Sequence, residues 1–135
     1  MFTRISLALA ALLTLVTPVL AEKAPDNVDG ATTVSITEAV ALFDEGAVFV
    51  DVRKPSDFDA GRVPGAVNLY LREALTEDAL ISEVGKDETV VFYCNGVKCD
   101  MSSQACAKAV SWGFKQVHYM REGFPGWEAA GLPVE

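Results

Sequence analysis

One stretch, from Val90 to Asp100, constrains the fold of this chain more than any other. It begins with the apolar run Val90-Val91-Phe92-Tyr93, which is typical of a strand buried on both faces. The run ends at Cys94, and a polar loop containing Gly96 separates it from a segment of helical periodicity. Open α/β sheets bind ligands at the carboxyl ends of their parallel strands. The order of strand, cysteine, loop and helix therefore places Cys94 at the carboxyl end of a parallel strand, where such sheets bind their ligands.

The loop and the helix after it favour a reactive cysteine. Apolar residues recur at helical spacing from Met101 to Trp112, so a helix follows the loop directly. Backbone N–H groups of the loop and the helix N-terminus would surround the sulfur of Cys94 with positive potential, which favours the reactive thiolate. We therefore expect Cys94 to be a nucleophile. The alternative is an inert buried thiol, since free cysteines often behave as small hydrophobes.

Short strands alternate with helices along the rest of the chain. We expect strands at 33–36, 47–50, 66–69, 89–93 and 117–120, and helices from Thr37 to Gly46, from Pro55, within 72–84 in two pieces, at 101–112 and within 123–132. This alternation is typical of a parallel sheet covered on both faces. The sequence predicts one α/β domain with a five-stranded, mostly parallel sheet and helices on both faces.

The first residues predict export. Residues 1–21 are similar to a secretory signal peptide, with Arg4 as the positive start, an apolar segment from Ile5 to Val16, and small residues ending at Ala21 as the cleavage site. The alternative is an uncleaved anchor, which the short apolar segment disfavours. We expect residues 22–32 to be a flexible lead-in, residues 33–135 to form the domain, and the mature protein to be periplasmic or secreted, monomeric and free of the membrane.

Charge and cysteine count limit the partners. The 135-residue chain carries a formal net charge of -8, so nucleic acid and anionic membrane surfaces are poor partners. Its three cysteines, Cys94, Cys99 and Cys106, leave at least one thiol outside any intramolecular pair. Cys106 falls on the apolar face of the 101–112 helix, which indicates a packing role.

Two further segments resemble one known family. Asp51 to Asn68 resembles the first signature of rhodanese-like domains, and Val117 to Val134 resembles their closing segment, with the Cys94 strand between them. The resemblance covers nearly all of the chain from about Thr33 onward. It implies a single-domain sulfurtransferase: Cys94 would take sulfane sulfur from a small anionic donor such as thiosulfate, form a persulfide, and pass the sulfur to cyanide or a thiol. It calls for no metal and no organic cofactor.

The resemblance also assigns substrate binding to the loop after Cys94, which consists of Asn95, Gly96, Val97, Lys98, Cys99 and Asp100. Loop N–H groups can stabilise an anion without a general base. Lys98 would steer an anionic donor, although a solvated loop cation is the more ordinary role. Asp100 fits the helix N-cap, but its charge opposes an anionic substrate. Asp51 and Arg53 end a neighbouring strand, where an ion pair bracing the loop is expected.

Cys99 departs from the family pattern, which commonly closes the loop with an arginine at this position. Cys99 is a resolving thiol that pairs with Cys94, a relay that accepts the sulfur, or a passive residue. Two thiolates alone do not complete a zinc site. A second function therefore stays open, an exported thiol–disulfide or redox protein that uses both cysteines. A phosphatase is disfavoured because no arginine closes the loop, and a non-catalytic binding module because Cys94 is present.

Overall fold

The computed structural model describes residues 23–135; the expected signal peptide, residues 1–21, lies outside the described residues. In chain order the elements are β1 (Thr32–Thr33), α1 (Ile36–Asp44), β2 (Val48–Asp51), α2 (Pro55–Ala60), β3 (Val67–Asn68), α3 (Glu77–Ile81), β4 (Thr89–Tyr93), α4 (Met101–Ser111), β5 (Gln116–Met120) and α5 (Gly123–Ala129). The strands form one sheet in the order β1-β5-β4-β2-β3, and every pairing is parallel. The predicted five-stranded α/β architecture is confirmed.

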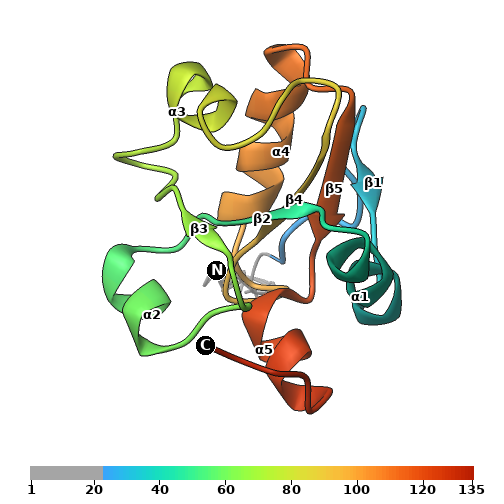
Figure 1. Ribbon diagram of the computed structural model, residues 1–135, viewed down its shortest axis with the longest axis vertical. Coiled ribbons are helices and arrows are strands. Elements are labelled where there is room, and N and C mark those ends of the chain that lie inside the picture. The colour runs from blue at the N-terminus through green and yellow to red at the C-terminus, as the bar shows by residue number, and fades with distance from the viewer. Residues whose placement is uncertain (1–22) are drawn as a thin grey trace, which may run out of the picture.

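Helices cover both faces of this sheet. Because strand side chains alternate, Val90 and Phe92 of β4 pack in one buried cluster with Ala105 of α4, while Tyr93 packs in the other cluster with Trp127 of α5. In Figure 1, α1 and α5 lie together in the lower part of the view, away from α3 and α4. Within residues 23–135 no helix combines the length and apolar character that a membrane span requires.

The first helix shows how local sequence sets the element boundaries. Ser35 accepts a hydrogen bond from the Glu38 N–H (3.1 Å), and the Glu38 carboxylate accepts one from the Ser35 N–H (3.3 Å), so both members of a capping box are present. Helix α1 therefore begins at Ile36, one residue before the expected start. The same cap ends the preceding strand, and β1 is shorter and earlier than the expected strand at 33–36.

The described part of the expected lead-in packs on the domain. Ala24 is buried, and its N–H donates to the Val97 carbonyl in the loop after Cys94 (2.8 Å). The Arg121 guanidinium donates to the Ala24 carbonyl (2.8 Å), and the Tyr119 hydroxyl donates to the Pro25 carbonyl (2.9 Å). These contacts join Ala24 and Pro25 of the expected lead-in to the domain. The polar composition of the lead-in does not predict a partner such as Arg121, which lies 97 positions after Ala24 in the chain.

Candidate active site

Cys94 directly follows the central strand β4. Tyr93, the last residue of β4, pairs with Asp51 at the end of β2 and with Met120 at the end of β5. Cys94 therefore stands at the carboxyl edge of the sheet, between two strands that end at the same level. The loop of residues 94–100 connects it to α4. This is the position that the order of strand, cysteine, loop and helix predicts.

Cys94 and Cys99 form a disulfide bond, with their Cα atoms 6.2 Å apart. The residue Cys94 has no exposed surface, whereas Cys99 is half-buried. Cys106 is the free thiol, buried in α4, and its sulfur lies 3.7 Å from the His118 carbonyl oxygen. Burial raises the pKa of the Cys106 thiol, so this group stays protonated and unreactive at neutral pH. The three cysteines thus divide into a loop pair and a core residue.

This division predicts the outcome of thiol titration. In protein oxidised by air, we expect Ellman's reagent to find no reactive thiol in the native state, one after denaturation, and three after denaturation with reduction. The physical reason is that Cys106 is shielded by packing and the other two sulfurs are bonded to each other. Three thiols in the denatured, unreduced protein would contradict the Cys94–Cys99 bond.

Hydrogen bonds from three directions hold the loop after Cys94. The Cys94 carbonyl accepts from the Phe124 N–H (2.9 Å), and the Cys99 N–H donates to the Gly96 carbonyl (2.9 Å). Asn95 is exposed; its amide nitrogen donates to the Asp57 carboxylate (3.3 Å), and its amide oxygen accepts from Arg53 Nη1 (3.3 Å). The loop is consequently fixed by α5, by its own turn, and by the segment after β2.

The predicted ion pair between Asp51 and Arg53 is present and buried. Arg53 Nη2 lies 2.7 Å from Asp51 Oδ2, and Arg53 Nε donates to Asp51 Oδ1 (3.0 Å). Arg53 also donates to the Gly61 carbonyl (2.6 Å), and its guanidinium lies over the Phe124 ring. Burial by itself lowers the pKa of Arg53, but the hydrogen bond and charge of Asp51 outweigh it, so the pKa is raised. Through Arg53, the pair therefore contacts both Asn95 of the loop and Phe124 of α5.

The two charged residues beside Cys99 border a hollow. Lys98 and Asp100 line a cavity of about 370 Å³ together with Lys23, Ala24 and Pro25 of the N-terminal segment. Both Lys98 and Asp100 are exposed. Lys98 thus lies beside a hollow, and its steering role stays a prediction. Lys23, which the sequence analysis did not single out, adds a second cation to the same hollow.

Asp100 takes the N-cap position of α4 without capping the helix. Its side chain makes no capping hydrogen bond, and its backbone angles (φ -90°, ψ 1°) differ from the extended conformation that such caps adopt. Its carbonyl oxygen instead accepts from the Gln104 N–H (3.1 Å) and the Ser103 hydroxyl (2.7 Å). The prediction that Asp100 occupies the N-cap position is confirmed, whereas the prediction that its side chain caps the helix is wrong.

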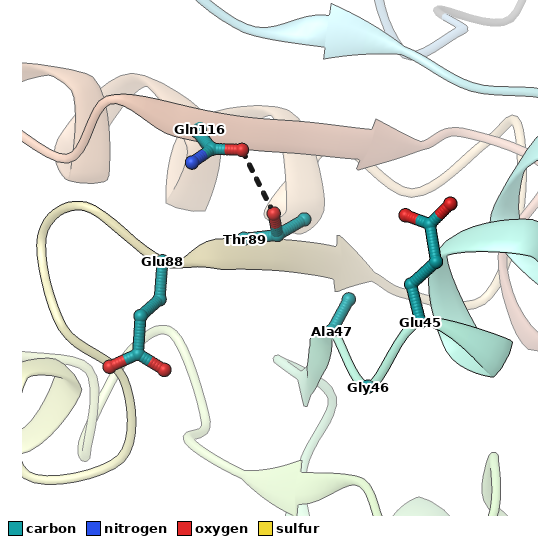
Figure 2. A pocket seen from close by; sticks show the side chains of 6 residues that line it. All are labelled: Glu45, Gly46, Ala47, Glu88, Thr89 and Gln116. Carbon is teal, nitrogen blue, oxygen red and sulfur yellow. Dashed lines mark hydrogen bonds between the residues drawn. The ribbon is translucent and has the colours of Figure 1, made fainter.

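A second hollow, of about 250 Å³, lies at the opposite edge of the sheet (Figure 2). It is lined by Glu45, Gly46 and Ala47 before β2, Glu88 just before β4, Thr89 at the start of β4, and Gln116 at the start of β5. The Thr89 hydroxyl donates to the Gln116 side-chain oxygen (3.0 Å). This hollow holds carboxylates and no cysteine, and the whole length of β4 separates it from Cys94. The carboxyl edge is therefore the candidate active site.

Fold and site together define a single α/β domain with a cysteine at the end of its central parallel strand. The family model of the rhodanese-like domain matches residues 35–130. The chain belongs to the rhodanese-like domain family.

Relatives in this family include sulfurtransferases. The chain is 34% identical over 102 residues to the thiosulfate sulfurtransferase GlpE of Pseudoalteromonas translucida, covering 72% of this chain and 89% of that one. It is 34% identical over 91 residues to a sulfurtransferase of Allochromatium vinosum, covering 67% and 79%. The human single-domain sulfurtransferase TSTD1 superimposes with a TM-score of 0.63 at 25% identity, covering 73% and 96%.

The same domain also occurs inside longer proteins. The chain is 35% identical over 86 residues to the HTH-type transcriptional regulator Rv0324 of Mycobacterium tuberculosis, and the match covers 64% of this chain but only 36% of the regulator. Membership of the family therefore defines the domain, and the sulfurtransferases among its relatives support a sulfurtransferase. The substrates need an argument from the site.

Proposed function

We propose that this protein is a thiosulfate sulfurtransferase of the rhodanese type that acts through a persulfide on Cys94. The observation that carries the proposal is the position of Cys94 at the carboxyl edge of the sheet, in a loop of backbone amides followed by the N-terminus of α4. This environment favours a thiolate. The sulfurtransferases among the relatives give independent support.

The chemistry needs a nucleophile and an anion-stabilising loop. The Cys94 thiolate attacks the outer sulfur of thiosulfate, and sulfite leaves with the electron pair of the broken S–S bond. Cyanide or a thiolate then takes the outer sulfur, so Cys94 returns as thiolate. Lys98 and Lys23 attract the anionic donor toward the hollow beside the loop. The bracing pair Asp51–Arg53 keeps the loop in place through Asn95.

The proposed activity requires prior reduction, because in the oxidised protein the Cys94 sulfur is bonded to Cys99 and Cys94 has no exposed surface. Reduction must therefore both free the Cys94 sulfur and open it to the donor. We expect reduced protein to form thiocyanate from thiosulfate and cyanide, and oxidised protein to form none. Cys94→Ser should lower the rate by on the order of 10⁶-fold or to background, the scale seen when a covalent nucleophile is lost. Cys106→Ser is the matched control, since it removes a thiol that packs in the core, and it should keep its rate.

The assay is discontinuous thiocyanate detection on reduced, desalted protein, with circular dichroism to show that each variant is folded. Thiocyanate formation by a folded Cys94→Ser variant would overturn the proposal.

The disulfide supports a second candidate, a thiol–disulfide exchange protein. Such a protein cycles between the bonded and the reduced pair and carries no sulfur adduct. It predicts that Cys94→Ser and Cys99→Ser abolish dithiol oxidation equally, and that thiosulfate leaves the mass of the reduced protein unchanged. Release of sulfite on mixing with thiosulfate favours the sulfurtransferase.

We further propose that the protein works outside the cytoplasm. A disulfide in the active loop persists in an oxidising compartment, which supports the signal peptide expected at residues 1–21. Fractionation of producing cells, followed by mass measurement of the N-terminus, tests both the location and the cleavage after Ala21.

A further inference from the structure

The loop cysteines differ in access. Cys94 has no exposed surface, while Cys99 is half-buried and is flanked by Lys98 and Asp100 at the rim of the hollow. Their disulfide closes a loop that keeps its own turn, from the Cys99 N–H to the Gly96 carbonyl (2.9 Å), and its anchor from the Phe124 N–H to the Cys94 carbonyl (2.9 Å). The bonded state thus includes both of these backbone hydrogen bonds. Cys99 Sγ is consequently placed within bonding reach of Cys94 Sγ itself.

We propose that Cys99 resolves the Cys94 persulfide, so that the protein reduces sulfane sulfur to sulfide at the expense of an external dithiol. This inference rests on the proposed function, because it needs a persulfide on Cys94. It extends that function by an internal acceptor and by a partner of defined chemistry. The loop disulfide is then an intermediate of turnover.

The resolving step balances as a thiol–disulfide exchange. The Cys99 thiolate attacks Cys94 Sγ, the inner sulfur of the protonated persulfide. The Cys94–Cys99 bond forms, the bond to the outer sulfur breaks, and that sulfur leaves as hydrosulfide with the electron pair. Hydrosulfide is a weaker base than an alkyl thiolate, and less basic sulfur leaves faster. The two cysteines lose two electrons, and the sulfane sulfur gains them.

The structure favours this step over a relay. A relay requires Cys99 to attack the outer sulfur, which lies one S–S bond beyond Cys94 Sγ. The disulfide instead shows Cys99 bonded to Cys94 Sγ, with a Cα separation of 6.2 Å that falls within the ordinary range for a disulfide. Attack on the inner sulfur therefore leads to a product that the loop already accommodates.

A dithiol must return the pair to the reduced state. An incoming thiolate reaches a disulfide at its accessible sulfur. Of the two residues only Cys99 has exposed surface, so Cys99 is the one that an incoming thiol reaches. The external thiol therefore forms a mixed disulfide with Cys99, Cys94 leaves as thiolate, and the second thiol of the dithiol releases Cys99. Over one turnover, thiosulfate and two thiols give sulfite, sulfide and a disulfide.

A single-turnover experiment tests the proposal. Reduced, desalted protein is mixed with thiosulfate without any reductant, and sulfite, sulfide and the intact mass are measured. The wild type should release one equivalent each of sulfite and sulfide, lose two hydrogens from its mass, and keep no added sulfur. Cys99→Ser should release sulfite, retain one added sulfur, and release sulfide at least about tenfold more slowly, since an intramolecular thiol acts at a high effective concentration. Cys106→Ser, the control, should match the wild type.

The outcomes separate this inference from the proposed function. If the wild type retains the added sulfur and releases no sulfide, the resolving role is wrong and the sulfurtransferase stands. If the added sulfur is found on the peptide that carries Cys99, Cys99 is a relay, which also overturns the resolving role. If neither the wild type nor Cys99→Ser releases sulfite, the proposed function itself fails. Sulfide released equally fast by Cys99→Ser likewise rejects the proposal.

Discussion

Replacing Arg53 with methionine is expected to lower the free energy of unfolding by about 3–5 kcal/mol, the cost of breaking a buried ion pair by removing one partner. Methionine keeps an apolar chain over the Phe124 ring, where the Arg53 guanidinium lies 4.7 Å from the ring centre. It leaves the carboxylate of Asp51, which is fully buried, without its charged partner. It also removes the donor to Asn95, so the active loop loses one of its supports.

The matched control is Lys115→Met. Lys115 pairs with Asp87 at 3.0 Å, but both side chains are mostly exposed, so we expect a change within about 1 kcal/mol. Urea unfolding of the oxidised proteins gives both changes in the free energy of unfolding, provided that the dependence of this free energy on urea concentration has the same slope in each protein. If Arg53→Met costs no more than Lys115→Met, the buried pair does not brace the site. The double variant Asp51→Asn with Arg53→Met should recover part of the loss, because no unpaired charge then remains buried.

The sheet could be predicted from the sequence because its signals are local. The run from Val90 to Tyr93 is apolar and β-branched, and it forms the core of β4 within the bounds expected. Pro55 starts α2 as expected, since its ring fixes φ at a helical value and needs no donor. Hydrophobic periodicity and turn residues depend only on residues that are close together in the sequence. They therefore locate most elements to within a few residues. The exception is the segment 72–84, expected as two helical pieces, where the structure has only α3 (Glu77–Ile81).

The candidate site was predictable only in part. Chain order alone predicts that Cys94 follows one strand and that Asp51 and Arg53 stand at the end of another. The contacts of Ala24 with Val97 and Arg121 join residues far apart in the sequence, and no local pattern reports them. The Cys94–Cys99 pairing was one of three alternatives, because spacing alone does not fix how two cysteines meet.

Gly123 is the second position at which a small change should have a large effect. It has φ +64°, and a Cβ built there would collide with the Cys94 carbonyl and the Gly96 amide nitrogen, two backbone groups of the active loop. Neither can move aside as a flexible side chain would. A glycine at the start of α5 is the sequence signal for this close approach, although it does not say which backbone comes near.

Gly123→Ala is expected to cost about 2–5 kcal/mol, the sum of about 1–2 for a left-handed conformation and about 1–3 for overpacking. Gly113→Ala is the control: its φ is +87°, but no atom lies within 4 Å of its built Cβ, so only about 1–2 kcal/mol is expected. Urea unfolding measures both. Because the added methyl group pushes directly on the Cys94 backbone, Gly123→Ala should also reduce thiocyanate formation under conditions where the protein is folded, whereas Gly113→Ala should not. Equal effects of the two substitutions on stability and rate would mean that α5 does not set the position of Cys94.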